Sequence, residues 1–244
     1  MISICILTWN RPQFLEMCVD DLLKKMFYVD DFEIVIKNNG SAEQTKKVLE
    51  KYRQNFNIRI IESKKHKGLN AYKELFNKAK GDYIIDVDDD VLEFPLHFDK
   101  AMVEYMKEYT DYGFLALNVL QNEYTNGAKP SDSSYVEDAR GGNVVQKGPA
   151  GGWCACFRKR DYRKIQIFFN VASLSFKNGE DAMLASLFRK VLKLKSGIIK
   201  SQVCFHATGA YYAKKYGHLE REIEKYSSNQ LDSLAEHYKS FLDN

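Results

Sequence analysis

The first ninety residues alternate between two hydrophobic patterns. Short runs rich in Ile and Val occupy residues 2–7, 33–37, 58–61 and 83–87. Between these runs, apolar residues recur at the three- and four-residue spacing of an amphipathic helix. Strands that alternate with helices are typical of βαβ units, in which parallel strands form one sheet between layers of helices. The sequence therefore predicts an α/β fold with a mixed, mostly parallel sheet flanked by helices.

The second half of the chain is less regular. Turn-forming residues gather in residues 121–152, which we interpret as long loops over an active site rather than as a linker. Apolar residues spaced along residues 219–241 predict a single C-terminal amphipathic helix. The remaining predicted elements are a helix near 98–106, strands at 113–119, 153–157 and 198–205, and a helix at 181–191.

Charge and cysteine content exclude several classes of protein. The chain of 244 residues carries 36 Lys and Arg against 33 Asp and Glu, a net charge of +3, and this balance gives no indication of a nucleic-acid partner. Its five cysteines lack the spacing of a disulfide framework or a zinc finger, which favours buried thiols in a reducing compartment. No apolar stretch approaches the ~20 residues that span a bilayer. We expect a cytoplasmic protein, with peripheral membrane contact left open.

Three consecutive acids, Asp88, Asp89 and Asp90, follow the predicted strand at 83–87. In an open α/β sheet, ligands bind at the carboxyl ends of the strands, where these acids lie. Three adjacent carboxylates repel one another unless a cation is present, and hard oxygen ligands suit Mg²⁺ or Mn²⁺, which in turn bind diphosphates. A solvated acidic turn is the alternative. The position of the three acids after a buried strand favours the metal site.

The acidic run and the turn Thr8-Trp9-Asn10-Arg11 together resemble the family 2 glycosyltransferases of the GT-A fold, a Rossmann-like α/β fold. The resemblance covers residues 1–206. It implies an inverting enzyme that moves one sugar from a nucleoside diphosphate sugar to a hydroxyl acceptor with the help of Mn²⁺ or Mg²⁺.

The resemblance also implies a division of the chain. Residues 1–206 would form the catalytic domain, with a nucleotide-binding half at 1–90 and an acceptor half at 91–206. Residues 207–244 would form a loop and a helical tail. The tail helix is a candidate surface for a homodimer.

Residues in the first half are implied to bind the nucleotide sugar. The family has an Asp-Asp-x-Ser loop after its second strand, whereas this chain has Asn38-Asn39-Gly40-Ser41. An Asn amide both donates and accepts hydrogen bonds, so it can still pair with a pyrimidine edge, and a UDP-sugar remains the favoured donor. The residues that match the family's nucleotide-sugar contacts are Thr8, Asn10, Arg11, Asn39, Lys67, Asp88 and Asp89.

Gly179-Glu180-Asp181 opens the predicted helix at 181–191. In inverting members of the family, an Asp at this place is the general base, and a carboxylate can take the acceptor's proton if it lies within hydrogen-bond reach. A helix N-cap pair is the plainer alternative. The resemblance also assigns acceptor binding to Glu180 and to Trp153, although a Trp is as often part of a core.

His206 ends the last predicted strand. In the resembled fold a His at this place often completes the coordination of the metal, here with Asp90, or contacts the diphosphate. A structural or exposed His is the alternative. Basic residues near 158–164 and 189–200, with Phe168 and Phe169 beside the first group, are compatible with solvated surface or with a membrane-associated acceptor.

Acceptors and rival functions remain open at this stage. A saccharide or lipid-linked acceptor is favoured, and a nucleic-acid acceptor is not excluded. The rival functions are a sugar-nucleotide pyrophosphorylase, which would normally have a Gly-rich loop after its first strand, and a non-catalytic nucleotide-sugar-binding module. The chain has Leu7-Thr8-Trp9-Asn10 at the place of that loop.

Overall fold

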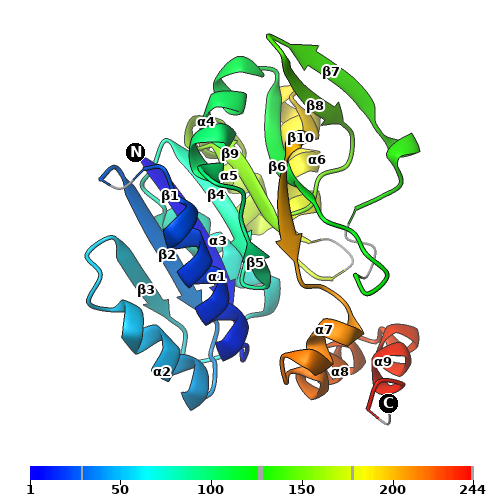
Figure 1. The fold of residues 1–244 in the computed structure, drawn as a ribbon. Helices are drawn as coiled ribbons and strands as arrows, with labels where there is room; N and C mark the ends of the chain where they lie inside the picture. The colour runs from blue at the N-terminus through cyan, green and yellow to red at the C-terminus, as the bar shows by residue number, and fades with distance from the viewer. Residues whose placement is uncertain (29, 126–128, 177–178, 243–244) are drawn as a thin grey trace.

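The computed structural model describes residues 1–28, 30–125, 129–176 and 179–242. One sheet runs through these residues, with the strand order β3-β2-β1-β4-β9-β6-β10-β8-β7 and with β5 paired to β10. Helices cover both faces of the sheet, and three short helices lie at the C-terminal end of the chain (Figure 1).

The first half forms the predicted parallel sheet. Strand β1 pairs in parallel with both β2 and β4, and β2 pairs with β3. The βαβ prediction is therefore confirmed for this half. Its elements are β1 (Ile2–Thr8), α1 (Pro12–Lys25), β2 (Phe32–Asn38), α2 (Glu43–Tyr52), β3 (Ile58–Glu62), a 3₁₀ turn (Gly68–Asn70), α3 (Ala71–Lys78) and β4 (Tyr83–Asp88).

Antiparallel strands complete the sheet in the second half. Strand β9 (Cys154–Arg158) lies between β4 and β6 (Tyr112–Val119) and is antiparallel to both. Strand β10 (Lys195–His206) is parallel to β6, and its last residues pair with the short β5 (Val91–Glu93). The end of β10 is thereby brought beside the end of β4.

Two layers of helices cover the two faces of the sheet. Helices α1, α2 and α4 (Phe98–Glu108) lie on the nearer face in Figure 1, and α3, α5 (Lys159–Val171) and α6 (Glu180–Leu192) lie on the other. Phe76 of α3 packs within 5.9 Å of Phe169 of α5, measured between ring centroids. Such aromatic contacts bury large apolar areas and join the helices of this layer.

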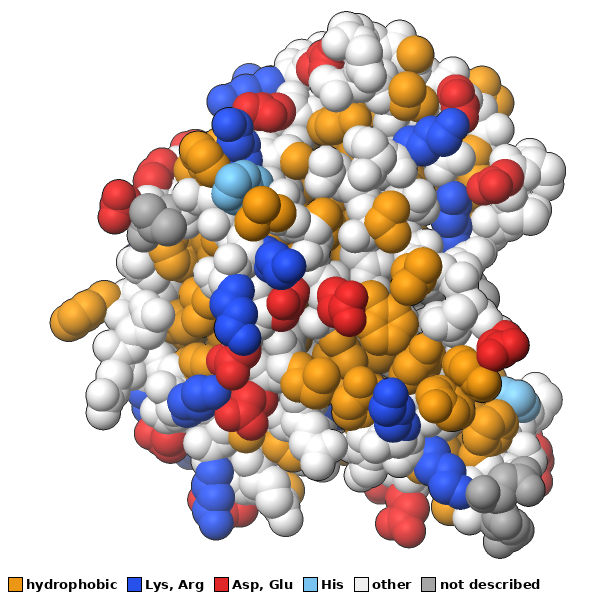
Figure 2. Space-filling view, viewed as in Figure 1, with side chains coloured by type: hydrophobic (Ala, Val, Ile, Leu, Met, Phe, Trp, Pro, Cys, Tyr) orange, Lys and Arg blue, Asp and Glu red, His pale blue; other side chains and the backbone are white. Residues whose placement is uncertain are grey.

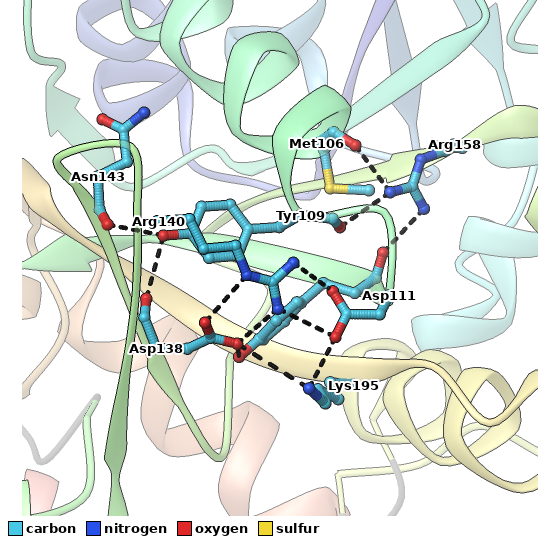
Figure 3. A network of polar contacts seen from close by, with 9 residues as sticks. Met106, Tyr109, Asp111, Asp138, Arg140, Asn143, Arg158 and Lys195 are labelled. Carbon is cyan, nitrogen blue, oxygen red and sulfur yellow. Dashed lines mark hydrogen bonds and ion pairs between the residues drawn. The ribbon is translucent and has the colours of Figure 1, made fainter.

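A buried arginine holds the corner where α4 meets β6 (Figure 3). Arg158 is 3% exposed and donates hydrogen bonds to the carbonyls of Met106 (2.7 Å), Tyr109 (3.1 Å) and Tyr112 (2.8 Å). The last carbonyls of a helix lack partners within the helix, and a buried guanidinium satisfies them here. The interpretation of Arg158 as part of a basic surface is therefore wrong.

The predicted loop region at 121–152 contains a β-hairpin formed by β7 (Val136–Arg140) and β8 (Asn143–Lys147). Arg140 holds this hairpin to the same corner through two hydrogen bonds to Asp111, at 2.8 and 3.1 Å, and further bonds to Asp138 (Figure 3). Strand β7 is polar and largely exposed at the edge of the sheet, and only Val145 and Gln146 of β8 are buried, so the hairpin lacks the apolar alternation that would have predicted it.

The C-terminal segment also differs from the prediction. Residues 219–241 form two helices rather than one, α8 (Leu219–Ser228) and α9 (Asp232–Lys239), and α7 (Ala210–Lys215) precedes them. Gln230 has a φ of 57°, which interrupts a right-handed helix. Helix α5 was not predicted, because its first turns read as a charged surface segment.

The molecular surface adds two observations. On the face viewed in Figure 2, hydrophobic side chains gather around the end of β10 and α7, where Tyr211 stacks on Tyr124 with a centroid distance of 4.1 Å. Among the residues that the structure describes, no helix is both long and apolar enough to cross a membrane. The five cysteines are buried and free, as expected from their spacing.

Candidate active site

A cavity of about 530 Å³ opens at the carboxyl ends of β1 and β4. The β1–α1 turn and the segment before α3 line one part of it, and residues 174–176 and the start of α6 line another. Helix α8 contributes a third wall from the C-terminal segment. The predicted location of the site, at the carboxyl edge of the sheet, agrees with this cavity.

Asp88, Asp90 and His206 meet inside the cavity. His206 Nε2 lies 3.0 Å from Asp90 Oδ1 and 3.7 Å from Asp88 Oδ2, and one ligand atom from each residue lies within 4.8 Å of the others. Burial and the nearby Asp90 raise the pKa of Asp88 to about 6. A divalent cation would relieve this crowding of like charges, and two carboxylates with an imidazole suit Mn²⁺ or Mg²⁺.

The neighbouring Asp89 has a different environment. It is fully buried, lies outside the residues that line the cavity, and forms an ion pair with Arg11. Arg11 also donates to Asp90 Oδ2 at 2.6 Å. Burial raises the pKa of Asp90, but Arg11 and His206 outweigh that effect and hold this pKa well below its usual range. Asp89 therefore positions Arg11 beneath the acids, which does not fit the expected contact with a ribose.

Trp9 and the predicted Arg11 reach the cavity from the β1–α1 turn, whereas the predicted Thr8 and Asn10 do not. The Trp9 ring stacks on His66 with a centroid distance of 4.1 Å. Thr8 is buried beneath it, and Asn10 lies outside this cavity, where its Oδ1 accepts a hydrogen bond from the Ala42 amide at 2.7 Å. Thr8 and Asn10 thus shape the turn and do not line the cavity as expected.

Asn39 lines the cavity and also holds the segment before α3. Its Oδ1 accepts from the Lys67 amide at 2.9 Å, and its Nδ2 donates to the Gly68 carbonyl at 3.0 Å. The Lys67 side chain points instead to Glu74, with an Nζ–Oε2 distance of 3.5 Å, so His66 and Gly68 take its expected place in the cavity wall.

Asp181 and Glu180 enter the cavity from the first turn of α6. Asp181 Oδ2 accepts from the Gly152 amide at 3.2 Å, and Oδ1 accepts from the Ala182 amide at 2.6 Å. Burial raises the pKa of Asp181 and, more strongly, that of Glu180. A carboxylate with a raised pKa is a better proton acceptor, which suits the expected role of Asp181.

The glycine that precedes Trp153 allows this arrangement. A Cβ atom on Gly152 would lie 3.0 Å from Glu180 Oε1 and 3.3 Å from Asp181 Cβ. A side chain at this position would therefore have to displace the two acids slightly. Trp153 itself is 4% exposed and donates from Nε1 to the Leu117 carbonyl at 2.9 Å, so it belongs to the core and does not form the expected platform for an acceptor sugar.

Helix α8 supplies two cations that the sequence analysis did not identify. Arg221 and Lys225 line the cavity one helical turn apart, and both form ion pairs with the buried Glu222. Burial raises the pKa of Glu222, but Lys225 and Arg221 outweigh it and lower this pKa to about 2. Arg221 Cζ lies 4.7 Å from the centroid of the Trp9 ring, and Lys225 Nζ lies 5.5 Å from that of Phe176. The i, i+4 spacing of basic residues was the available signal.

Known proteins resemble the chain both in sequence and in fold. A chondroitin synthase of Pasteurella multocida is 35% identical over 113 residues, which are 45% of this chain and 11% of that protein. The abequosyltransferase RfbV of Salmonella typhimurium is 31% identical over 146 residues, or 56% of this chain and 44% of that protein. The chain thus spans less than half the length of either relative.

Solved structures match a larger share of the chain. The mannosyltransferase PcManGT of Pyrobaculum calidifontis, in complex with GDP-Man and Mn²⁺, has a TM-score of 0.66 at 14% identity and covers 92% of this chain and 61% of its own. Residues 1–349 of TarS of Staphylococcus aureus, in complex with UDP, have a TM-score of 0.62 at 14% identity and cover 88% of this chain and 62% of their own.

Residues 3–175 match the family described as Glycosyl transferase family 2. The chain therefore belongs to glycosyl transferase family 2 and adopts the GT-A fold.

Proposed function

We propose that this chain transfers one sugar from a nucleoside diphosphate sugar to a hydroxyl acceptor, with inversion at the anomeric carbon. One observation carries the proposal: the cluster of Asp88, Asp90 and His206 and the carboxylate of Asp181 line the same cavity. A site for a leaving diphosphate and a base for an attacking hydroxyl are thereby available in one cavity.

The donor would lie in the part of the cavity that is lined by the β1–α1 turn and the segment before α3. Trp9 and His66 offer ring faces for the base, and Asp88, Asp90 and His206 would hold Mn²⁺ or Mg²⁺. When bound, such an ion supplies Lewis-acid stabilisation of the charge on the leaving diphosphate. Arg221 and Lys225 add positive charge on the wall formed by α8.

Asp181 would act as the general base. Its carboxylate takes the proton from the acceptor hydroxyl while the oxygen forms a bond to the anomeric carbon, and the bond from that carbon to the diphosphate oxygen breaks. The nucleoside diphosphate leaves with the electron pair of that bond. The amides of Gly152 and Ala182 orient the carboxylate for this role.

A UDP-sugar is the first donor to test. TarS structures contain UDP and UDP-GlcNAc, whereas PcManGT contains GDP-Man, so a panel must include both bases. The relatives include a chondroitin synthase and a poly(ribitol-phosphate) β-N-acetylglucosaminyltransferase, which supports a saccharide or polyol polymer as acceptor for this chain.

The test is incubation of the purified protein with Mn²⁺ and a panel of nucleotide sugars and acceptors. We expect release of free nucleoside diphosphate and a product whose anomeric configuration, measured by NMR, is inverted. Asp181→Asn should lower the rate of release by about two to four orders of magnitude, whereas Asp82→Asn, at the opposite edge of the sheet, should not change it. A pyrophosphorylase would instead form a nucleoside triphosphate from pyrophosphate, and a binding module would release nothing.

The metal can be tested by binding alone. Neutral imidazole is a good ligand for Mn²⁺ and a poorer one for Mg²⁺. His206→Ala is therefore expected to weaken nucleoside diphosphate binding supported by Mn²⁺ more than binding supported by Mg²⁺, measured by calorimetry. Unchanged binding in the presence of Mn²⁺ would show that His206 has no place at the metal.

A further inference from the structure

An exposed apolar stripe runs along the outer side of α5. Ile167, Phe168 and Val171 are 75%, 52% and 77% exposed, although each is a large hydrophobic residue. They are spaced i, i+1 and i+4, so they share one face of the helix. The neighbouring Phe169 is fully buried, which separates the packed face of α5 from this exposed one.

Basic side chains continue the same face. Arg160, Arg163 and Lys164 are exposed on the first turns of α5, and Arg189 and Lys190 are exposed on the last turns of the adjoining α6. Residues 159–192 contain three acids in all. Asp161 is buried between Arg158 and Lys164, whose Nζ lies 3.2 Å from its Oδ1, and Glu180 and Asp181 lie in the cavity, so none of the three pairs with Arg160 or Arg163.

The chain direction relates this face to the active site. Strand β9 runs antiparallel to β4, so α5 begins at the edge of the sheet opposite the cavity and runs back toward it. The apolar residues lie in the second half of α5, and residues 174–176, which follow the helix, line the cavity. The apolar part of the face therefore lies toward the active-site edge and the basic part toward the far edge.

We propose that the α5 face, defined by Arg160, Arg163, Ile167, Phe168 and Val171, docks the protein on a membrane surface that contains anionic lipids. Exposed apolar side chains beside Lys and Arg, without acids, are the pattern of segments that lie in the headgroup region of a bilayer. Basic residues are attracted to anionic headgroups, whereas a protein partner would require a complementary acidic surface. Docking in this orientation turns the active-site edge toward an acceptor attached to lipid.

The test is co-sedimentation of the full chain with vesicles, without donor or acceptor, so its outcome is independent of sugar transfer. Vesicles of equal parts phosphatidylglycerol and phosphatidylcholine are compared with vesicles of phosphatidylcholine alone, at ~0.1 M salt. We expect binding to the anionic vesicles alone. Absence of binding to them would overturn the proposal.

Three variants locate the binding surface. The variant Ile167→Ser/Phe168→Ser/Val171→Ser should lose detectable binding. The variant Arg160→Gln/Arg163→Gln should bind about thirtyfold more weakly, because each basic residue near an anionic surface contributes ~1 kcal/mol to binding. Lys214→Gln/Lys215→Gln on α7 removes the same charge from another surface and should bind as the unmodified chain does. Thermal unfolding confirms that each variant is folded.

Two further results would contradict the proposal. Equal weakening by the α7 variant would indicate general attraction of the whole protein to anionic vesicles. Self-association of the unmodified chain that the triple serine variant abolishes, measured by sedimentation equilibrium without lipid, would assign the α5 face to a second copy of the chain.

Discussion

Acidification is expected to weaken the folded state through His218, the residue between α7 and α8. Its ring is 9% exposed and packs edge-on against Phe14, with a centroid distance of 4.2 Å. Burial, and then the charge of Arg11, lower the pKa of His218 from 6.5 to about 4. The folded protein therefore holds this imidazole neutral at a pH where the unfolded chain has already bound a proton.

The sign and size of the effect follow from linkage. A lowered pKa in the folded state gives a contribution that is complete above pH 6.5 and is lost as the pH falls toward 4. Each unit of pKa shift corresponds to about 1.4 kcal/mol, so the full loss is about 3 kcal/mol and the loss at pH 5 is about 2 kcal/mol.

Urea unfolding at pH 8 and pH 5 measures this effect. The free energy of unfolding of the unmodified chain should fall between the two pH values by about 2 kcal/mol more than that of His218→Gln, whose amide does not titrate. His237→Gln, on the exposed side of α9, should show the same pH dependence as the unmodified chain. If His218→Gln does so as well, the imidazole is not held neutral by burial and the reasoning is wrong.

Three further predictions concern the cavity and the core. Asp181→Asn should lower the rate of transfer by about two to four orders of magnitude with little change in donor affinity, and unchanged turnover would exclude it as the base. Asp90→Ala should weaken Mn²⁺ binding in calorimetry by roughly tenfold or more, whereas full turnover in excess chelator would remove the metal from the mechanism. Arg221→Met/Lys225→Met should weaken binding of a nucleoside diphosphate but not of the nucleoside, and equal losses for both ligands would contradict a contact with phosphate.

A fourth prediction separates Trp153 from the acceptor site. Trp153→Phe leaves the buried Leu117 carbonyl without its hydrogen bond, so it should lower the free energy of unfolding by about 1–3 kcal/mol. The Michaelis constant for the acceptor should not change in the folded enzyme. A raised Michaelis constant with unchanged stability would restore the residue to the site.

Elements whose buried residues form a regular apolar pattern could be predicted from the sequence, and the others could not. The helix from Pro12 has apolar residues at helical spacing because one side of it packs on the core, and the strand at 83–87 is an apolar run because both of its faces are buried. In the β7–β8 hairpin only Val145 and Gln146 are buried, and Arg140 with its acidic partners holds it to the corner. Helix α5 exposes apolar residues and begins with charged ones, so its pattern does not mark a buried side.

The same distinction applies to the site. Asp88, Asp90 and Asp181 were predictable because each follows a strand or opens a helix at the carboxyl edge of the sheet. Arg221 and Lys225 reach the cavity only because the tail folds back over Trp9 and Phe176, and their i, i+4 spacing does not show where their helix packs. Asp89 does not line the cavity as expected, because three adjacent acids point in different directions once a strand ends.

The position of Asp90 sets the order in which the protein acquires its activity during synthesis. Its carboxylate is bonded to Arg11, 79 residues earlier in the chain, and lies beside His206, 116 residues later. The half of the sheet from β1 to β4 can form while the chain is still emerging from the ribosome, because N-terminal units fold first. The pairing of β10 with β6 must wait for residue 195 and beyond, and such distant pairings form slowly. A nascent chain therefore contains the three acids long before His206 joins them, and the cluster is complete only when the last strand is in place.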